Sequence, residues 1–361
     1  KGLPHFFIKD LPPSSSINID IKRPEIYFSE KPNDSYVIVN TKQKEFDYPK
    51  GNNNIYTHYK GSGGILLDTF TKKLVFALKF SDTKILISSL ISSESRLVFD
   101  AHINTITKKI APFLNYDEDP YLVLTNNGKL VWLIDAYTIS KNFPYSEPIG
   151  KSINYIRNSV KISIDAYSGK TSFYITDEND PIIRTLSKTY KNLFLPFSEM
   201  PIELKNHIRY PKDLFNIQAH MFKIYHMNNP EVFYTKEDTW DIPIEKYDDK
   251  EQYMNSYYTI TKLPNEKKDS FIIMLPYTAA RKNNMIAWLS AKCDLDQYGV
   301  LKVYKFPKEK NIFGPRQIEA RIDQNTDISK SLTLWGQVGS KVIRGNIMVI
   351  PIEKSLIYVE P

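Results

Sequence analysis

Short apolar runs that are rich in β-branched and aromatic residues predict strands in the first quarter of the chain. One run covers 36–39, and two more cover 74–80 and 85–90, joined by a polar turn at 81–84. The first residues contain two consecutive prolines and three consecutive serines and show no periodicity. They predict an extended linker over 1–20.

A β-hairpin is predicted near the middle of the chain. Apolar runs at 121–124 and 130–134 flank Asn-Asn-Gly, a strong hairpin signal. Because both runs are apolar on both faces, we expect the hairpin at the centre of a sheet. Apolar and polar residues then alternate over 160–164, which predicts a half-buried strand. This strand turns at 167–170 and returns through 173–175.

Helix start signals and apolar spacings of three and four residues predict four helices. Ser92 or Ser93 caps the first, and Asp180, followed by proline, caps the second. The other two start at Tyr210–Pro211 and Asn229–Pro230. The apolar stripe of the first helix consists of Phe99, Ile103, Ile106, Ile110 and Phe113.

The last third of the chain returns to strand patterns. Strands and helices are partly segregated, which favours an α+β fold with mixed, largely antiparallel sheets and flanking helices over a doubly wound sheet. We expect one α+β domain over 21–361. The polar, acidic segment 241–253 is a long loop or the boundary between two lobes. The later strands are predicted at 271–275, 285–292, 300–306 and 343–351.

Composition changes this picture in three ways. No run of about 18 or more apolar residues is present, so no segment is predicted to span a bilayer. The chain starts with Lys1, and we expect it to be part of a longer protein. The only cysteine, Cys293, cannot form an internal disulfide; an inert thiol is favoured over a nucleophile, which would need a positioned base.

The net charge is +7, but only nine of the 48 cationic residues are Arg and the lysines are scattered. Nucleic-acid binders usually gather Arg and Lys on one face, so no nucleic-acid partner is predicted. A solvated basic surface is the simpler interpretation, and an anionic membrane or wall polymer is the favoured partner. The 24 tyrosines suit core packing in sheets and also wet or sugar-binding grooves.

Three apparent motifs fail. Gly150-Lys151-Ser152 lacks the glycine that a phosphate-binding loop needs at position 145, which is Tyr. Asp294 starts a segment that resembles a calcium loop, but its last ligand position is Lys305. The six histidines show no metal-binding spacing.

Aspartates at the ends of the predicted central strands are the strongest candidates for chemistry. Converging carboxylates bind a hard cation or share a proton, whereas Asp before Pro or in a turn bonds to its own backbone. The catalytic candidates are Asp117, Asp119, Asp135 and Asp165. Asp177 and Asp180 are the metal candidates, with Ca²⁺ or Mg²⁺ as the candidate ion, and no other cofactor is predicted. The binding candidates are Arg157, Asn158, His207, Arg209 and Tyr210.

Several short strings lie along the whole chain, at 111–114, 119–121, 135–138, 154–161, 207–211, 334–335, 345–346 and 358–361. Together they resemble an uncharacterised family of bacterial membrane proteins, number zero-one-eight-two among the uncharacterised protein families. The resemblance implies transmembrane helices followed by one large domain on the extracytoplasmic side of the cell membrane, with the chain's own transmembrane segments as its first partner. It implies no reaction and no catalytic residues.

Three hypotheses follow. The first is a non-catalytic binding or assembly domain that recognises an envelope component or the membrane surface. The second is a carboxylate-dependent hydrolase of an envelope polymer, assisted by Ca²⁺ or Mg²⁺. The third is a structural homo-oligomer around a membrane pore. A cleft with paired carboxylates favours the second, and an exposed aromatic groove favours the first.

Overall fold

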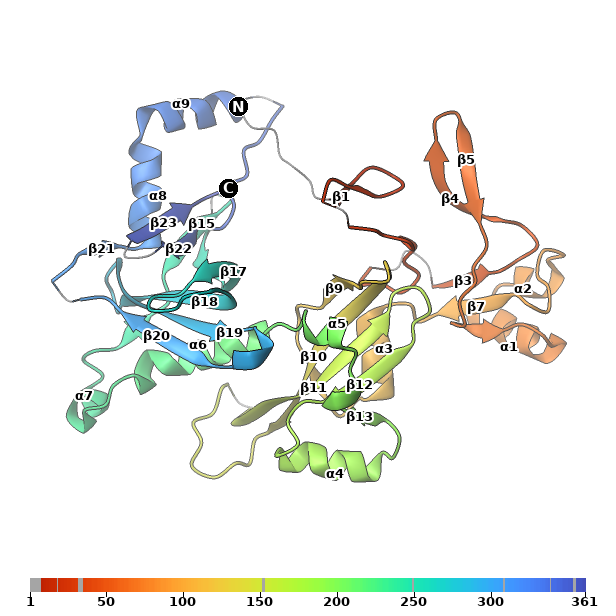
Figure 1. Ribbon diagram of the computed structural model, residues 1–361, viewed down its shortest axis with the longest axis horizontal. Helices are drawn as coiled ribbons and strands as arrows, with labels where there is room; N and C mark the ends of the chain where they lie inside the picture. Colours follow the sequence, from red (N-terminus) through yellow and green to blue (C-terminus); the bar gives the residue numbers. More distant parts are fainter. Residues whose placement is uncertain are drawn as a thin grey trace. The chain divides into compact units, whose positions relative to one another are not determined.

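A computed structural model describes residues 8–17, 19–31, 35–150, 153–248, 250–307, 309–337, 339–352 and 355–361. The chain divides into two compact units, Lys1–His207 and Ile208–Pro361. Each contains largely antiparallel sheets and helices, so the predicted α+β class is confirmed (Figure 1).

The division does not fall in 241–253. That segment belongs to the second unit, where most of it forms the two-stranded β15–β16 sheet (Ile244–Tyr247 and Lys250–Tyr253). Both strands are short; β16 is mostly solvent-exposed, whereas β15 buries Glu245.

A six-stranded sheet is the centre of the first unit. Its order is β13-β12-β11-β10-β8, with β9 also paired to β10, and only β12–β13 is parallel. The predicted hairpin is confirmed as β9–β10, and Gly128 adopts φ 72° in its turn. The hairpin was expected at the centre of a sheet, but of its two strands only β10 lies inside the sheet, because β9 pairs with β10 alone. The strands are β8 (Asn115–Tyr116), β9 (Tyr121–Leu124), β10 (Leu130–Ser140), β11 (Tyr155–Asp165), β12 (Thr171–Ile175) and β13 (Phe194–Pro196).

Helices α3 (Ile103–Ile110) and α4 (Pro181–Thr189) contribute Ile103 and Ile183 to the same buried cluster as the apolar residues of β10 and β11. Strand β11 is not half-buried as predicted, because Lys161 and Ser163 on its other face are buried as well. The predicted first helix starts later than expected: His102 caps α3, and Phe99 ends a strand. Short segments η1 (Phe197–Glu199) and α5 (Ile202–Lys205) follow β13.

The predicted strands at 74–80 and 85–90 are wrong. They form helices α1 (Phe70–Phe80) and α2 (Lys84–Ile87) (Figure 1, orange). The Thr69 hydroxyl accepts a hydrogen bond from the amide of Lys72 and starts α1, and Ser81 ends it in the left-handed region. A small sheet of β3 (Tyr36–Val39), β7 (Arg96–Phe99) and β6 (Ile65–Leu66) shares a core with α1 and α2. Two hairpins complete the unit: β1 (Ile8–Lys9) with β2 (Ser14–Ser15), inside the predicted linker, and β4 (Glu45–Lys50) with β5 (Asn53–Thr57).

The second unit is built on a sheet of order β14-β18-β19-β20, in which β17 also pairs with β18 and β21 with β19. Helices α6 and α7 start at the predicted prolines, and the hydroxyl of Tyr277 on β18 donates to the carbonyl of Ala219 on α6 at 2.7 Å. Helices α8 and α9 were not predicted, and the strand expected at 343–351 starts only at Met348. The elements are α6 (Lys212–Tyr225), α7 (Pro230–Thr235), β14 (Trp240–Asp241), β17 (Tyr257–Lys262), β18 (Asp269–Ala279), β19 (Asn284–Lys292), η2 (Leu295–Gln297), β20 (Leu301–Lys305), β21 (Ile312–Phe313), α8 (Pro315–Gln324), α9 (Thr326–Trp335), β22 (Met348–Ile352) and β23 (Ser355–Val359).

Candidate functional site

Asp135, a catalytic candidate, forms a buried ion pair. It lies on β10 directly opposite Lys161 on β11, and the Lys161 ammonium contacts its Oδ1. Both side chains are at least 95% buried. Burial raises the pKa of Asp135, and the neighbouring Lys161 ammonium opposes that shift. The pair neutralises two charges inside the fold, which is a structural role.

Asp117 lies close to this pair. Its backbone amide donates to the carbonyl of Asp135 at 3.0 Å, and its negative charge is a further factor that raises the pKa of Asp135. The Asp117 carboxylate accepts hydrogen bonds from the Tyr137 hydroxyl and from the amide of Asp119. The side chain of Asp119 is exposed. The structure therefore brings Asp117 and Asp135 together but leaves Asp119 on the surface.

The remaining aspartates complete local structures. Asp165 accepts hydrogen bonds from the amides of Tyr167 and Ser168, as in a turn. Asp177 forms an ion pair with Arg157 at 2.7 Å. Asp180 is fully buried and accepts hydrogen bonds from the first amides of α4 and from Thr138, Ser159 and Tyr155.

The environment of Asp180 sets its protonation state. Burial raises its pKa, but the hydrogen bonds from Ser159, Thr138 and Tyr155 outweigh burial, so the pKa lies below the ordinary value. Asp180 is thus a charged helix cap. Among the residues that the structure describes, no group of three or more His, Cys, Asp or Glu is placed to hold a metal ion.

The remaining binding candidates make separate local contacts. The side-chain amide Nδ2 of Asn158 on β11 donates to the carbonyl of Ala136 at 3.3 Å, and Nδ1 of His207 lies 2.6 Å from the carbonyl of Glu203. In the second unit, the Arg209 guanidinium lies 5.2 Å from the ring centre of Tyr258. The Tyr210 hydroxyl donates to Gln218 at 2.8 Å, and the Tyr210 amide donates to Sγ of the buried Cys293 at 3.3 Å.

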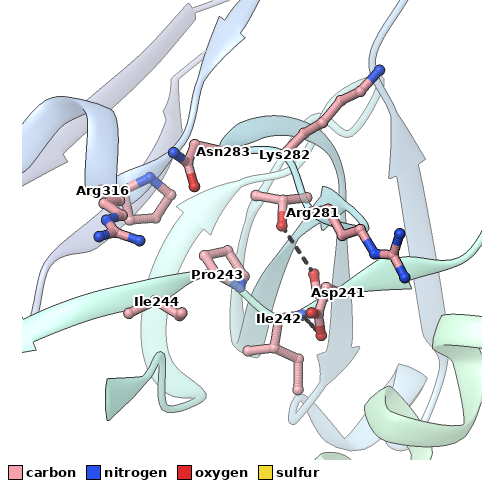
Figure 2. Close-up of a pocket in the computed structure, with 10 residues that line it drawn as sticks. Asp241, Ile242, Pro243, Ile244, Arg281, Lys282, Asn283 and Arg316 are labelled. Atoms are coloured by element: carbon pink, nitrogen blue, oxygen red, sulfur yellow. Dashed lines mark hydrogen bonds between the residues drawn. The ribbon is translucent and has the colours of Figure 1, made fainter. Parts of the chain in front are cut away.

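Figure 2 shows one pocket of the second unit, of about 310 Å³. It lies between the segment 241–244, the turn at 281–283 and the start of α8. Gly314 is required here, because a Cβ at this position would lie 1.9 Å from the carbonyl oxygen of Asn283.

The charges around this pocket do not form one binding centre. Asp241 pairs with Lys223 at 2.7 Å, and Arg316 pairs with Glu251 at 2.9 Å. In Figure 2 the side chain of Lys282 extends away from Asp241. The pocket therefore presents mixed, diverging charges rather than a convergent set of ligands for one anion or cation.

A second cavity of the same unit, of about 430 Å³, has a different character and is called the aromatic groove below. Its volume is within the range of ligand pockets, about 300–1,000 Å³. Ten of its fourteen lining residues are aromatic, aliphatic or proline. These are Pro264, Trp288, Tyr304, Phe306, Pro307, Ile312, Phe313, Pro351, Leu356 and Tyr358, and the polar ones are Lys305, Lys310, Asn311 and Ser355.

The wall of the aromatic groove is held in place by the core beneath it. The rings of Trp288 and Tyr304 stack with centroids 4.2 Å apart, and Trp288 belongs to a fully apolar buried cluster. The Tyr358 hydroxyl donates to the carbonyl of Phe313, and burial raises the pKa of Tyr358 to about 12. Its hydrogen bond ties β23 to β21 at the wall of the groove.

Together these features define an α+β protein with an aromatic ligand-sized groove. The family model that matches residues 1–335 is described as "Uncharacterised protein family (UPF0182)". The chain belongs to this family.

Relatives named "UPF0182 protein" cover all of the chain. Those from Desulforamulus reducens, Sulfurovum sp. and Alkaliphilus metalliredigens are 53%, 52% and 54% identical to it. The chain spans only 39%, 40% and 38% of their respective lengths. No solved structure matches the chain.

Sequence reasoning missed the aromatic groove. Its residues come from five separate segments, and each segment alone looks like ordinary strand or turn sequence. The one available signal was the tyrosine content, which was interpreted as favouring core packing over a groove.

Proposed function

We propose that the chain is a non-catalytic binding domain on the extracytoplasmic side of a multipass membrane protein, and that the aromatic groove is its binding site. The ligand is a component of the cell envelope that presents an apolar or ring-shaped face. The observation that supports this proposal is the mostly apolar lining of the aromatic groove.

Three properties of the aromatic groove support binding. It is large enough for a small ligand and mostly apolar, and its few polar groups can orient what it binds. Its wall rests on the buried cluster around Trp288, so little ordering is needed on binding. Most of the predicted carboxylates, by contrast, form ion pairs, turns and a helix cap; Asp117 and Asp135 lie close together, but Asp135 is already paired with Lys161.

The membrane context is supported by the family resemblance and by chain length. More than half of each relative's length lies outside the matched region, which leaves room for a membrane part. Within the part of this chain that the structure describes, no helix is long and apolar enough to cross a bilayer.

Titration with N-phenylnaphthylamine, an apolar probe that fluoresces when bound, tests the groove. We expect saturable binding by the 361-residue chain. Leu356→Asp places a charge in the groove and should weaken binding at least about tenfold. Phe306→Ala provides a second variant that adds no charge.

The matched control is Ile357→Asp. Ile357 is the next residue on β23, is exposed and does not line the groove, because neighbouring residues on a strand point to opposite faces. Binding by this control should equal that of the unchanged chain. Equal losses in Leu356→Asp and Ile357→Asp, or no saturable binding by the unchanged chain, would refute the proposal. If the proposal holds, displacement of the bound probe by purified wall polymer or by lipid would identify the class of ligand.

A further inference from the structure

Helix α1 has two apolar faces, and only one of them is covered. Phe76 and Ala77 are buried, and Phe80 packs against the same cluster. Phe70, Leu74 and Leu78, each four residues apart, form a row that begins beside the covered face and turns away from it toward solvent. The exposed fractions of Phe70 and Leu78 are both 71%.

This exposed face is continuous along the helix. Val75 lies beside the row formed by Phe70, Leu74 and Leu78 and is 54% exposed. Helix α2 packs against α1 and exposes Ile87. Soluble proteins rarely leave such a contiguous apolar face in water, so it indicates a contact surface.

The charges around the exposed face are mostly positive. Helix α1 contains three lysines and no acidic residue, and α2 starts with Lys84. Of the two nearby aspartates, Asp68 is paired with Lys72 at 2.7 Å, and Asp82 accepts a hydrogen bond from the Tyr36 hydroxyl. Within the described residues, neither Lys73 nor Lys84 forms an ion pair, although the charge of Lys84 acts on the nearby Asp82.

We propose that the exposed face of α1 docks on the surface of an anionic lipid bilayer. An apolar stripe flanked by lysines is the pattern of helices that lie in the interface plane of a membrane. The stripe inserts among the acyl chains, and the lysines contact the lipid phosphates. An eleven-residue helix is too short to span the bilayer, so it lies flat. This surface is in the first unit and is independent of the aromatic groove.

Co-sedimentation of the 361-residue chain with lipid vesicles tests the docking. We expect binding to vesicles of phosphatidylcholine and phosphatidylglycerol in equal amounts, and much weaker binding to phosphatidylcholine alone. The double variant Phe70→Ser, Leu78→Ser removes two inserted side chains and should weaken binding by about tenfold or more. Lys73→Glu, Lys84→Glu should also weaken it by about tenfold and reduce its dependence on salt.

The matched control is Phe46→Ser, Tyr56→Ser on the β4–β5 hairpin. These two aromatic residues are 58% and 52% exposed and belong to the same unit. The control should bind vesicles like the unchanged chain. Equal loss in the control, unchanged binding by Phe70→Ser, Leu78→Ser, or equal binding to both vesicle types would overturn the proposal.

Two other occupants of the face give different results. If the chain forms a dimer without lipid and Phe70→Ser, Leu78→Ser is monomeric, the face joins two copies and the proposal fails. The second possible occupant is a segment of the full-length protein that lies outside this chain. To test for it, Leu78→Cys is introduced into the full-length protein and labelled with a thiol reagent; Cys293 of this chain is buried and should react little. Protection of this thiol in detergent without lipid would show that another part of the protein covers the face, and would also overturn the proposal.

Discussion

Glu266 holds two lysines of the second unit together, and replacing it with Gln tests how much this cluster stabilises the fold. Its carboxylate contacts the ammonium groups of Lys292, at 2.6 Å, and of Lys302. The Lys292 side chain is only 4% exposed, so it would lose its counter-charge inside the protein.

The size of the effect follows from the pKa of Glu266. Burial raises this pKa, but the two lysines outweigh burial and lower it from 4.5 to about 2. Such a shift corresponds to roughly 3 kcal/mol. Because Glu266 and Lys302 are partly open to water, we expect a smaller loss for Glu266→Gln, about 2 kcal/mol at neutral pH.

The pH dependence has a definite sign. A carboxylate with a lowered pKa stabilises the fold above its unfolded pKa and loses that contribution as the pH falls toward the folded value. The difference between the unchanged chain and Glu266→Gln should therefore be full at pH 7 and shrink between 4.5 and about 2.

Urea unfolding followed by tryptophan fluorescence measures this difference, because three of the four tryptophans lie in the second unit. The control is Glu251→Gln, which breaks the exposed pair with Arg316 and should cost less than about 0.5 kcal/mol. Equal losses in the two variants, or a Glu266→Gln difference that does not shrink in acid, would show that the cluster is not stabilising.

Three further predictions concern the aspartates. Asp180→Ala should lower the free energy of unfolding by about 3 kcal/mol, because it removes the α4 cap and leaves buried donors unpaired, whereas Asp180→Asn keeps the cap and should cost less; thermal melts of both variants check this. Lys161→Met should cost roughly 3 kcal/mol or more, because Asp135 stays buried without its partner, and adding Asp135→Leu should recover part of the loss in urea titrations. A chelator should leave the melting temperature unchanged, because Asp177 and Asp180 already have protein partners; a drop reversed by Ca²⁺ would restore the cation hypothesis.

Local signals predicted several elements correctly. The Asn-Asn-Gly turn defines the β9–β10 hairpin, and proline with a preceding Asp or Asn starts α4 and α7. In each case a few neighbouring residues contain the whole cause of the structure.

Elements whose pattern depends on tertiary contacts were missed. The run at 74–80 is apolar almost all round, so its period does not distinguish a strand from a helix with two apolar faces. Lys161 looks like the exposed side of a half-buried strand, and only the register with Asp135 shows that it is buried. For the aspartates the sequence left two interpretations open, a converging site or local caps and turns. Sequence alone cannot show which carboxylates already have backbone or cationic partners.

Hydrogen–deuterium exchange of the chain with and without saturating N-phenylnaphthylamine tests the central claim most directly. If the aromatic groove is the binding site, the probe slows exchange in β20, β21 and β23, which form its walls, and leaves the β4–β5 hairpin of the first unit unchanged. Unchanged exchange in β20, β21 and β23 at saturation, or equal slowing in β4–β5, would contradict it.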